Sequence, residues 1–401
     1  MMKKKDDDFH CILPKEDSFF LSLLPTKKEK QSKKSANDIL SVVQTKENND
    51  DILIQKCLRF EGEVGKGSFG NVCKVWNVLD EQFYAIKHIA IDSKKNQENE
   101  MKRILTEIRI LSRLSHPSII RYYSSWYDYK PSFPIKEESD ETTTSSSSSS
   151  SMSRIASKQN QNSKSNNDNN DNNGNNDNNG NNVVTSYESS SLSCEDMNFQ
   201  NHHFYIQMEY CICSIHKLLQ RTKETGELIS QKNKFMMIQQ TIDAIEFLHG
   251  NQIIHCDLNP NNLLLYSFSP LRIKIADFGL SQILNDEKEE LCTDLHYYGS
   301  FLYSSPEFYE RGICSKSCDI YSIGMFFLEL WMDFTTEMER IETLQKWKRN
   351  HYQQIFFKEE KNELFFSFLS QMIHYEKKKR PTIQECISFY MKNPPEFYMV
   401  E

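Results

Sequence analysis

The sequence predicts an α+β fold of two lobes, a β-rich small lobe and an α-helical large lobe, with a cleft between them. Three observations predict it. Residues 58–130 read as strands with one helix, whereas residues 203–390 carry apolar residues mostly at helical spacing. The tract between them, 131–202, has low complexity. Because chemistry-bearing motifs stand on both of its flanks, this tract interrupts one folded unit rather than separating two.

The composition bounds the class of protein. Lys and Arg number 48 and Asp and Glu 56, so the formal net charge is −8, which argues against direct nucleic-acid binding. Only 38% of the 401 residues are hydrophobic, which indicates that part of the chain does not fold. The nearest candidate for a membrane span, Ile320 to Trp331, is too short.

The N-terminus and the cysteines indicate a compartment. Residues 1–8 are charged and lead into no apolar core, so they are not a secretory signal. Eleven scattered cysteines are then expected to be reduced thiols. The closest pairs, Cys211/Cys213 and Cys314/Cys318, lack a second pair for zinc and are interpreted as buried or hinge cysteines. We expect a soluble, cytoplasmic protein.

Two stretches are expected to be disordered. Residues 1–55, rich in Lys, Asp, Asn and Ser, predict a disordered N-terminal extension. The insert 131–202 contains an unbroken serine run, Ser145 to Ser151, and residues 159–182 are all Gln, Asn, Ser, Lys, Asp or Gly. Such a tract has almost no apolar surface to offset the entropy of ordering its backbone.

The small lobe is predicted from period-2 and helical patterns. Leu58 to Val78 alternates around glycines, Gln82 to Ile91 predicts a strand, and a helix follows from about Gln97 to Leu114. One face of the strand carries Phe83, Ala85, Lys87 and Ile89, and the buried stripe of the helix is Ile104, Ile108, Leu111 and Ser115.

The large lobe is predicted to be helical. Its clearest helix has apolar residues at helical spacing and ends at Gly250. These apolar residues are Phe235, Ile238, Ile242, Ile245 and Leu248.

The first chemical motif is Gly65-Lys-Gly67-Ser-Phe-Gly70-Asn-Val72. A lone match of this kind is weak, because an ordinary hairpin turn gives the same pattern. A dinucleotide fingerprint would need a helix to open at the glycines, whereas a second strand follows here. Glycines in a strand–turn–strand let the backbone lie close over phosphates, since no Cβ intrudes, and so favour a nucleotide flap.

The second motif is Tyr84-Ala-Ile-Lys87. A strand lysine is usually a solvated surface residue. Lys87, however, follows the glycine loop by one strand and shares a face with the small Ala85, which suits an adenine pocket beside a phosphate contact. Glu107 on the predicted helix is a candidate counter-charge; the alternative is that it only decorates the helix surface.

The third and fourth motifs supply oxygen ligands. They are His255-Cys256-Asp257-Leu-Asn259-Pro-Asn-Asn262 and, after a short hairpin, Asp277-Phe-Gly279. Two aspartates and an asparagine from adjacent loops can hold magnesium ions that bridge the phosphates of a nucleotide. Four motifs in this order are far more specific than any one of them.

With these motifs, the chain from about 58 to 390 resembles a eukaryotic protein kinase. The resemblance implies the bilobal protein kinase fold, with a small lobe over about 58–211 and a large lobe over about 212–390. Ser305-Pro-Glu307 resembles the motif that closes the activation segment. Asp319 and Arg380 stand where that family has an aspartate of a large-lobe helix and the arginine partner of Glu307.

The resemblance also implies the catalytic roles. Lys87 would hold the α- and β-phosphates and pair with Glu107, and Asp257 would accept or orient the proton of the substrate hydroxyl. Asn262 and Asp277 would bind magnesium. The implied reaction is in-line phosphoryl transfer from MgATP to Ser or Thr, so ATP and Mg²⁺ are the implied cofactors.

The residues implied around ATP come from both flanks of the insert. Met208 would be the gatekeeper, and backbone groups of Glu209 and Cys211 would bond the adenine. The full implied set is Gly65, Gly67, Gly70, Val72, Ala85, Lys87, Met208, Glu209, Cys211 and Leu264.

Four further segments resemble the kinases of the alpha subunit of translation initiation factor two. Arg121-Tyr-Tyr-Ser-Ser-Trp126 precedes the insert and Phe204-Tyr-Ile-Gln-Met-Glu-Tyr-Cys211 follows it. Cys318-Asp-Ile-Tyr-Ser-Ile-Gly324 leads to Phe334-Thr-Thr-Glu-Met-Glu-Arg340. The resemblance implies that this factor is the protein substrate and that translation initiation falls under stress. It also implies a homodimer through the small lobe.

In that family the Met-Glu-Arg segment begins the helix on which the substrate docks, which places Thr336 at the start of the docking helix. A threonine followed by Glu337 and Glu339 is equally a sound helix N-terminus, so a purely structural role stays open.

Some positions depart from the family or are open in role. Cys256 replaces the arginine that normally pairs with an activation-segment phosphate. Asn259 replaces a lysine that neutralises the transferring phosphate, and Asn261, the other position that some kinases use, is also uncharged. Thr293 and Ser300 are candidate phosphosites, although both could simply pack or cap.

Three functions therefore compete. The leading one is an active kinase of the initiation-factor type. A nucleotide-binding pseudokinase that acts as a regulatory scaffold is the second, and Cys256 and Asn259 motivate it. A kinase of the same fold with other protein substrates is the third. The upstream signal is not visible in the sequence.

Overall fold

The computed structural model describes residues 57–67, 70–91, 97–128, 202–285, 289–294, 300–332, 334–349 and 363–393. The predicted N-terminal extension, 1–55, and the insert up to residue 201 lie outside the described residues. Among the helices that are described, none is long and apolar enough to cross a membrane.

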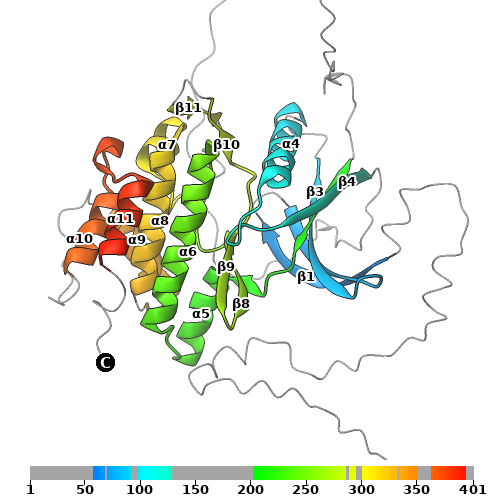
Figure 1. Cartoon of the computed structure of the whole chain (residues 1–401), viewed down its shortest axis with the longest axis horizontal. Helices are drawn as coiled ribbons and strands as arrows, with labels where there is room; N and C mark the ends of the chain where they lie inside the picture. Colours follow the sequence, from blue (N-terminus) through cyan, green and yellow to red (C-terminus); the bar gives the residue numbers. More distant parts are fainter. Residues whose placement is uncertain are drawn as a thin grey trace, which may run out of the picture. The chain divides into compact units, whose positions relative to one another are not determined.

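The small lobe is an antiparallel five-stranded sheet in the order β1-β2-β3-β5-β4, with one helix beside it (Figure 1). Its elements are β1 (Leu58–Gly67), β2 (Gly70–Asn77), β3 (Gln82–Ala90), α4 (Gln97–Arg113), β4 (Tyr122–Asp128) and β5 (His203–Glu209). The β-rich small lobe predicted from the sequence is confirmed. The insert joins β4 to β5, which are neighbours in the sheet, so the strands pair across it.

The stripe predicted for α4 is wrong at its C-terminal end. Ile104 and Leu111 are buried and Ile108 packs against the core, but Ser115 is exposed and lies beyond the helix, which ends at Arg113. Pro117 disfavours helical backbone at the residue before it, and this limits how far the helix can extend.

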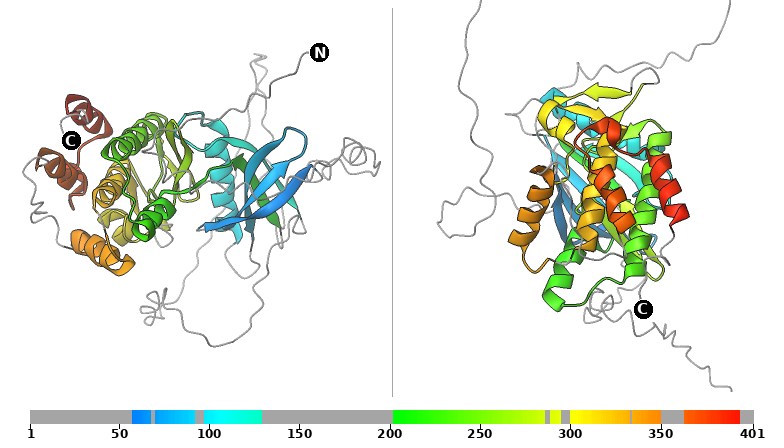
Figure 2. Two further views of the ribbon diagram at one scale, coloured as in Figure 1. Left: turned by 90° about the horizontal axis from the view of Figure 1, so that it is seen from below. Right: turned by 90° about the vertical axis from the view of Figure 1, so that its left-hand side faces the viewer.

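The large lobe is helical (Figure 2). Its described helices are α5 (Ile215–Thr225), α6 (Gln231–Gly250), α7 (Pro306–Arg311), α8 (Lys316–Trp331), α9 (Glu337–Arg349), α10 (Glu363–Met372), α11 (Ile383–Lys392) and the short 3₁₀ helix η5 (Lys377–Lys379). Short strands between them are β6 (Cys213–Ser214), β7 (Ile253–Ile254), β8 (Leu263–Phe268), β9 (Leu271–Ile275), β10 (Gln282–Ile283), β11 (Glu290–Cys292) and β12 (Ile313–Ser315).

Two helices, α6 and α8, form the centre of this lobe. All five apolar residues predicted to line α6 are buried, and the helix ends at Gly250, as expected. Every residue of α8 from Cys318 to Leu330 is buried, so the longest apolar run of the sequence is a core helix. Gly324 lets α10 approach, because a Cβ there would lie 2.6 Å from Ile373 Cγ2.

The two lobes meet behind the cleft. Ile120 N donates to Ile275 O at 2.8 Å, and Ile275 N donates to Ser118 O at 2.8 Å. The segment that follows α4 is thereby fixed against the end of β9. This contact sets the place of Asp277, two residues beyond β9, relative to Glu107 on α4.

Candidate active site

A cleft of about 390 Å³ lies between the sheet and the β8–β9 hairpin. This volume is in the range of small-molecule sites. Sequence-predicted residues that line it are Gly65, Val72, Ala85, Lys87, Glu107, Met208, Glu209, Cys211, Asn262, Leu264 and Asp277. The structure therefore brings together residues from both flanks of the insert and from both lobes.

The sheet register places the cleft-facing side chains of β3. Ala85 pairs with Met208 and Lys87 with Ile206, so side chains two apart on β3 share the cleft face. Lys87 is 3% exposed. Its Nζ lies 2.6 Å from Glu107 Oε1 and 2.7 Å from Asp277 Oδ1. Lys87 on β3 thus contacts both Glu107 on α4 and Asp277 of the Asp277-Phe-Gly279 motif.

Burial and neighbouring charges shift the pKa values of Lys87, Glu107 and Asp277. Burial alone would lower the pKa of Lys87, but the charges of Asp277 and Glu107 raise it above the ordinary value. Burial raises the pKa of Glu107, whereas Lys87 overcomes burial and holds the pKa of Asp277 below its usual range. Two carboxylates share one ammonium, so the cluster has a formal negative charge that a cation would offset.

The glycines have different tasks. A Cβ on Gly65 would meet nothing within 4 Å, so the backbone there leaves open space over the cleft. A Cβ on Gly70 would lie 2.1 Å from His88 O, so glycine is needed there for close approach to β3. Gly67 pairs with Gly70 at the tip of the hairpin. Close packing against β3 thus gives Gly70 a structural role, and its contact with a nucleotide stays a prediction.

Asp257 is held by neutral donors. It is 5% exposed, and its carboxylate accepts hydrogen bonds from Asn259 Nδ2 at 3.2 Å, Asn262 Nδ2 at 2.9 Å and Ser300 N at 3.1 Å. Burial, followed by the nearby charge of Asp277, raises the pKa of Asp257 to about 7. Such a carboxyl group is poised to take up a proton near neutral pH.

Asp319 of α8 holds the backbone that precedes Asp257. Asp319, fully buried, accepts hydrogen bonds from His255 N and Cys256 N, both at 3.0 Å, and lies 2.9 Å from His249 Nε2. The structure thus places Asp319 where the resemblance implied. Cys256 has a left-handed φ of 65°, a conformation that costs energy for a residue with a Cβ and that these two bonds help to hold.

Two side chains with oxygen atoms that could bind a metal ion, Asn262 and Asp277, line the cleft from two loops. Ala276 N donates to Asn262 O at 2.9 Å, which ties the loop of Asn262 to the residue before Asp277. Amide and carboxylate oxygens are ligands that magnesium accepts. Among the described residues, no group of three or more His, Cys, Asp or Glu side chains could hold a metal ion by itself. The donor set fits a magnesium ion that takes its remaining ligands from phosphates and water.

The two asparagines near Asp257 differ in availability. Asn259 is 4% exposed, its Nδ2 donates to Asp257, and its Oδ1 accepts from Asn261 N at 2.9 Å. Its side chain is used inside the loop. Asn261 is exposed and lines the cleft.

One expectation about the cysteines is wrong. Cys256 and Cys314 form a disulfide, whereas reduced thiols were expected throughout. The sequence spacing gave no signal for it, because 58 positions separate the two residues and only the fold brings them together. Cys318, which the sequence pairs with Cys314, is free and buried.

The end of the activation segment is anchored as the resemblance implied. Arg380 donates two hydrogen bonds to the Glu307 carboxylate, at 2.6 and 2.8 Å. Ser305 caps α7. Of the candidate phosphosites, Ser300 donates its N–H to Asp257, and Thr293 N donates to Gly312 O at 2.9 Å. Modification of either residue stays a prediction.

Helix α9 is fastened to the turn beside Asp257. Arg340 Nη2 donates to the hydroxyl of Tyr303 at 2.6 Å, and Arg340 Nε donates to Glu329 Oε1 at 2.5 Å. Lys348 Nζ donates to the carbonyls of Phe301 and, at 2.6 Å, Ser304. Sequence reasoning named the segment of Arg340 but missed the other five residues, which lie in three separate segments.

Thr336 lies at the N-terminus of α9, where its hydroxyl accepts a hydrogen bond from Glu339 N at 3.1 Å. The structural alternative, a sound helix start, is confirmed. Thr336 is exposed, and its docking role stays a prediction.

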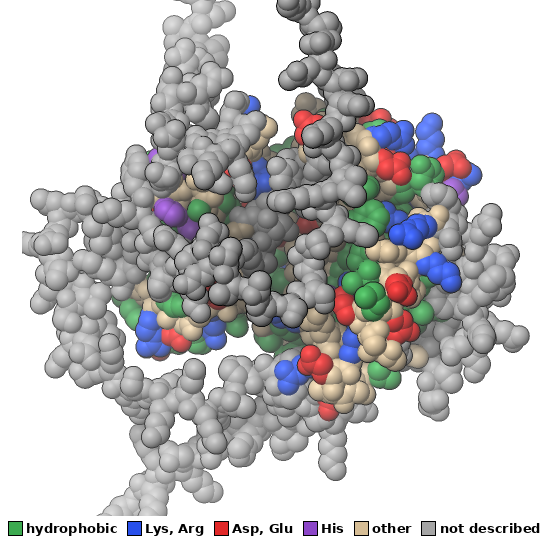
Figure 3. All heavy atoms as spheres, turned by 180° about the vertical axis from the view of Figure 1, so that it is seen from behind, with side chains coloured by type: hydrophobic (Ala, Val, Ile, Leu, Met, Phe, Trp, Pro, Cys, Tyr) green, Lys and Arg blue, Asp and Glu red, His purple; other side chains and the backbone are tan. Residues whose placement is uncertain are grey.

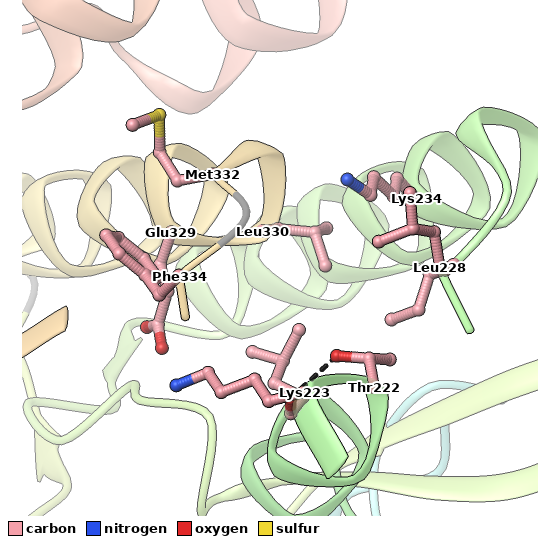
Figure 4. A pocket seen from close by; sticks show the side chains of 10 residues that line it. Thr222, Lys223, Leu228, Lys234, Glu329, Leu330, Met332 and Phe334 are labelled. Atoms are coloured by element: carbon pink, nitrogen blue, oxygen red, sulfur yellow. Dashed lines mark hydrogen bonds between the residues drawn. The ribbon is translucent and has the colours of Figure 1, made fainter. Parts of the chain in front are cut away.

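A second hollow of about 60 Å³ lies among α5, α6 and the end of α8. Figure 4 shows Leu228, Leu330 and Phe334 around it, with Lys223 and Lys234 at different edges. It is far smaller than the several hundred Å³ typical of ligand sites, and none of the predicted site residues lines it.

Comparisons with known proteins identify a family. A family model described as protein kinase domain matches residues 58–142 and 142–390. The chain is 29% identical to eIF-2-alpha kinase GCN2 of Arabidopsis thaliana, over 69% of this chain and 20% of that protein. It is 27% identical to the GCN2 of Schizosaccharomyces pombe, over 81% of this chain and 22% of that protein.

A probable serine/threonine-protein kinase of Dictyostelium discoideum is 30% identical over 72% of this chain and 54% of that protein. The chain thus spans about a fifth of the two GCN2 relatives and about half of the third.

Proposed function

Because this chain belongs to the protein kinase family, we propose that it transfers the γ-phosphoryl group of MgATP to serine or threonine of a protein. The observation that carries the proposal is the contact of Lys87 with both Glu107 and Asp277. This contact assembles a cation and an oxygen ligand in one cleft. A buried cluster of this kind is stable only while its charges stay paired, so the bound state would need a ligand that replaces these contacts.

The residues of the cleft divide the work. Lys87 binds the α- and β-phosphates, and Asn262 and Asp277 supply oxygen ligands to magnesium. The magnesium ion, when bound, neutralises charge that develops on the phosphates. Asp257 orients the substrate hydroxyl and accepts its proton, and Ala85, Met208 and Leu264 surround the adenine.

We assign the alpha subunit of translation initiation factor two as the substrate. The names of the relatives support this, since GCN2 of two organisms is an eIF-2-alpha kinase. Docking would use α9 near Thr336, and phosphorylation would lower translation initiation under stress. A homodimer through the small lobe and a cytoplasmic location belong to the same proposal.

No nucleic-acid binding is proposed. Where Figure 3 leaves described residues visible, basic and acidic side chains are interspersed.

A scaffold without activity is the second candidate. It is favoured by the two uncharged side chains, Asn259 and Asn261, at the positions where a kinase keeps a cation near the transferring phosphate.

One assay tests both. The purified chain is incubated with MgATP and recombinant initiation-factor alpha subunit, with the Asp277→Asn variant as control. We expect phosphate on serine or threonine of the substrate from the wild type and none from the variant. Equal signals from both would reject the kinase. Nucleotide binding without transfer would favour the scaffold, and transfer to other proteins alone would favour a different substrate.

A further inference from the structure

The Cys256–Cys314 disulfide links the residue before Asp257 to strand β12. Cys256 directly precedes Asp257, and Cys314 is the middle residue of β12. Both residues are buried, at 3% and 0% exposure. The bond thus joins the loop of the proposed base to a strand that follows the activation segment.

The strand β12 holds part of the activation segment itself. Leu291 of β11 pairs with Cys314, and each of the two strands contributes three residues to the pairing of β11 with β12. Thr293 N, just after β11, donates to Gly312 O. The disulfide therefore connects the catalytic loop, through one strand pair, to residues 290–293.

The surroundings of the bond are apolar. Cys256 and Cys314 share a buried cluster with Ile254, Leu280, Leu284, Phe308 and Cys318. Leu280 and Leu284 follow the Asp277-Phe-Gly279 motif, and Phe308 lies on α7. Segments from both ends of the activation segment thus meet at the two sulfurs.

Ordinary charge-based anchoring is absent at this position of the chain. Where the family has an arginine for an activation-segment phosphate, Cys256 carries no charge and cannot bind one. We propose that the Cys256–Cys314 bond replaces the phosphate–arginine contact as a reversible covalent tie, and that its reduction lowers the rate of phosphoryl transfer. The second half of this inference rests on the proposed kinase activity.

Formation and cleavage of the bond need an oxidant and a reductant, here hydrogen peroxide and a small dithiol. On oxidation, the two cysteine thiols lose two protons and two electrons to hydrogen peroxide, which becomes two water molecules, and the S–S bond forms. On reduction, a thiolate of a dithiol attacks one sulfur, and its second thiolate then resolves the mixed disulfide. Two cysteine thiols and the oxidised dithiol result.

The neighbouring cysteine does not compete for this exchange. Cys318 Sγ lies 3.4 Å from Glu307 Oε1 and 3.6 Å from Ser315 Oγ. Burial, followed by the charge of Glu307, raises the pKa of Cys318 to about 12, so it stays a thiol and is a poor nucleophile. Because the bonded sulfurs are buried, exchange requires the structure around them to open locally.

The test compares the full chain after treatment with dithiothreitol and after reoxidation with hydrogen peroxide. Alkylation followed by peptide mass mapping reads the bond directly. We expect a cross-linked Cys256–Cys314 peptide only in the oxidised chain. We also expect kcat for the protein substrate to fall about tenfold on reduction, as for a misplaced catalytic group, with KM for ATP unchanged. Reoxidation should restore kcat.

Cysteine variants separate the tie from general thiol effects. Cys314→Ser should have the reduced kcat under both conditions and should lack the rise in melting temperature that oxidation gives the wild type. Cys292→Ser, which removes an exposed free cysteine on β11, is the matched control and should keep the full redox response. If Cys314→Ser does not fold, the wild-type comparison still decides.

Two results would overturn the proposal: an oxidised chain with no Cys256–Cys314 peptide, or a mapped bond whose reduction leaves kcat unchanged. A chain that transfers no phosphate in either state rejects the kinase activity and the rate effect together. In that case a melting temperature that still rises with the mapped bond supports the tie as a structural element alone.

Discussion

The two sides of Asp257 are built by different physical means. On the nucleotide side, Lys87, Glu107 and Asp277 form a buried cluster of full charges. On the side of the activation segment, the loop is held by amide and backbone donors and by the Cys256–Cys314 bond. The first side is suited to a charged ligand, whereas the second needs no charge to stay in place.

The two sides should differ in their tolerance of mutation. A buried charge is stable only with its partner, so the proposed nucleotide side should respond sharply to any loss of charge. Each neutral hydrogen bond contributes less, so mutations on the other side should have smaller effects.

Removal of one charge from the nucleotide side should have the largest effect. Asp277→Asn loses the proposed magnesium ligand and removes the charge that pairs with Lys87, so we expect kcat to fall by about 10²–10³. Phosphorylation kinetics at saturating MgATP measure it. Asp243→Asn, an exposed aspartate on α6, is the control and should keep the wild-type rate. Comparable losses in both variants would show that the charged cluster is not special.

The turn beside Asp257 should come next. Lys348→Met removes two hydrogen bonds to the carbonyls of Phe301 and Ser304, and the same turn begins with Ser300, whose N–H holds Asp257. We expect kcat/KM for the protein substrate to fall by about tenfold through loss of positioning. Lys346→Met, an exposed lysine on the same helix, is the matched control. A wild-type rate in Lys348→Met would separate α9 from catalysis.

The ionisation of Asp257 should produce an acidic limb in the rate profile. Its pKa is raised to about 7, so below that pH the carboxyl is protonated and cannot accept the hydroxyl proton. We expect kcat/KM to rise with pH up to about 7 and then level off, measured between about pH 5 and pH 9.

A new cation should move that limb. Asn261 lines the cleft and is exposed, so Asn261→Lys adds charge without removing the hydrogen bonds of Asn259. The added charge should lower the pKa of Asp257, shift the limb to lower pH and raise the rate several-fold. Asn261→Gln is the neutral control. A limb that stays in place would mean that another group titrates.

The cap of α9 should give the smallest effect. Thr336→Ala removes the acceptor for Glu339 N and should lower the free energy of unfolding by about 1 kcal/mol, measured by denaturant titration. Thr336→Ser keeps a hydroxyl and should remain close to the wild type. If instead Thr336→Ala raises KM for the initiation-factor subunit while the free energy of unfolding is unchanged, docking rather than capping is its role.

The fold was predictable wherever the pattern is local. The period-2 strand from Gln82 and the helical stripe from Phe235 to Leu248 both appear with nearly the expected bounds. The helix α4 also ends within one residue of the predicted end, but Ser115, which was placed on its buried stripe, lies beyond it, near Pro117. Sequence reasoning named Gly70 for its place in the Gly-rich motif but could not show its close approach to His88 on the next strand.

The order of the motifs and the chemistry that each can perform follow from the sequence, because side-chain type and near-neighbour spacing are properties of the chain. The contacts between distant residues depend on the folded structure: Lys87 with Asp277, Lys348 with Phe301 and Cys256 with Cys314. The physical reason is that burial, charge sharing and bond formation depend on distance in space. Distance in space between residues tens of positions apart is set by packing of the whole core, not by any local pattern.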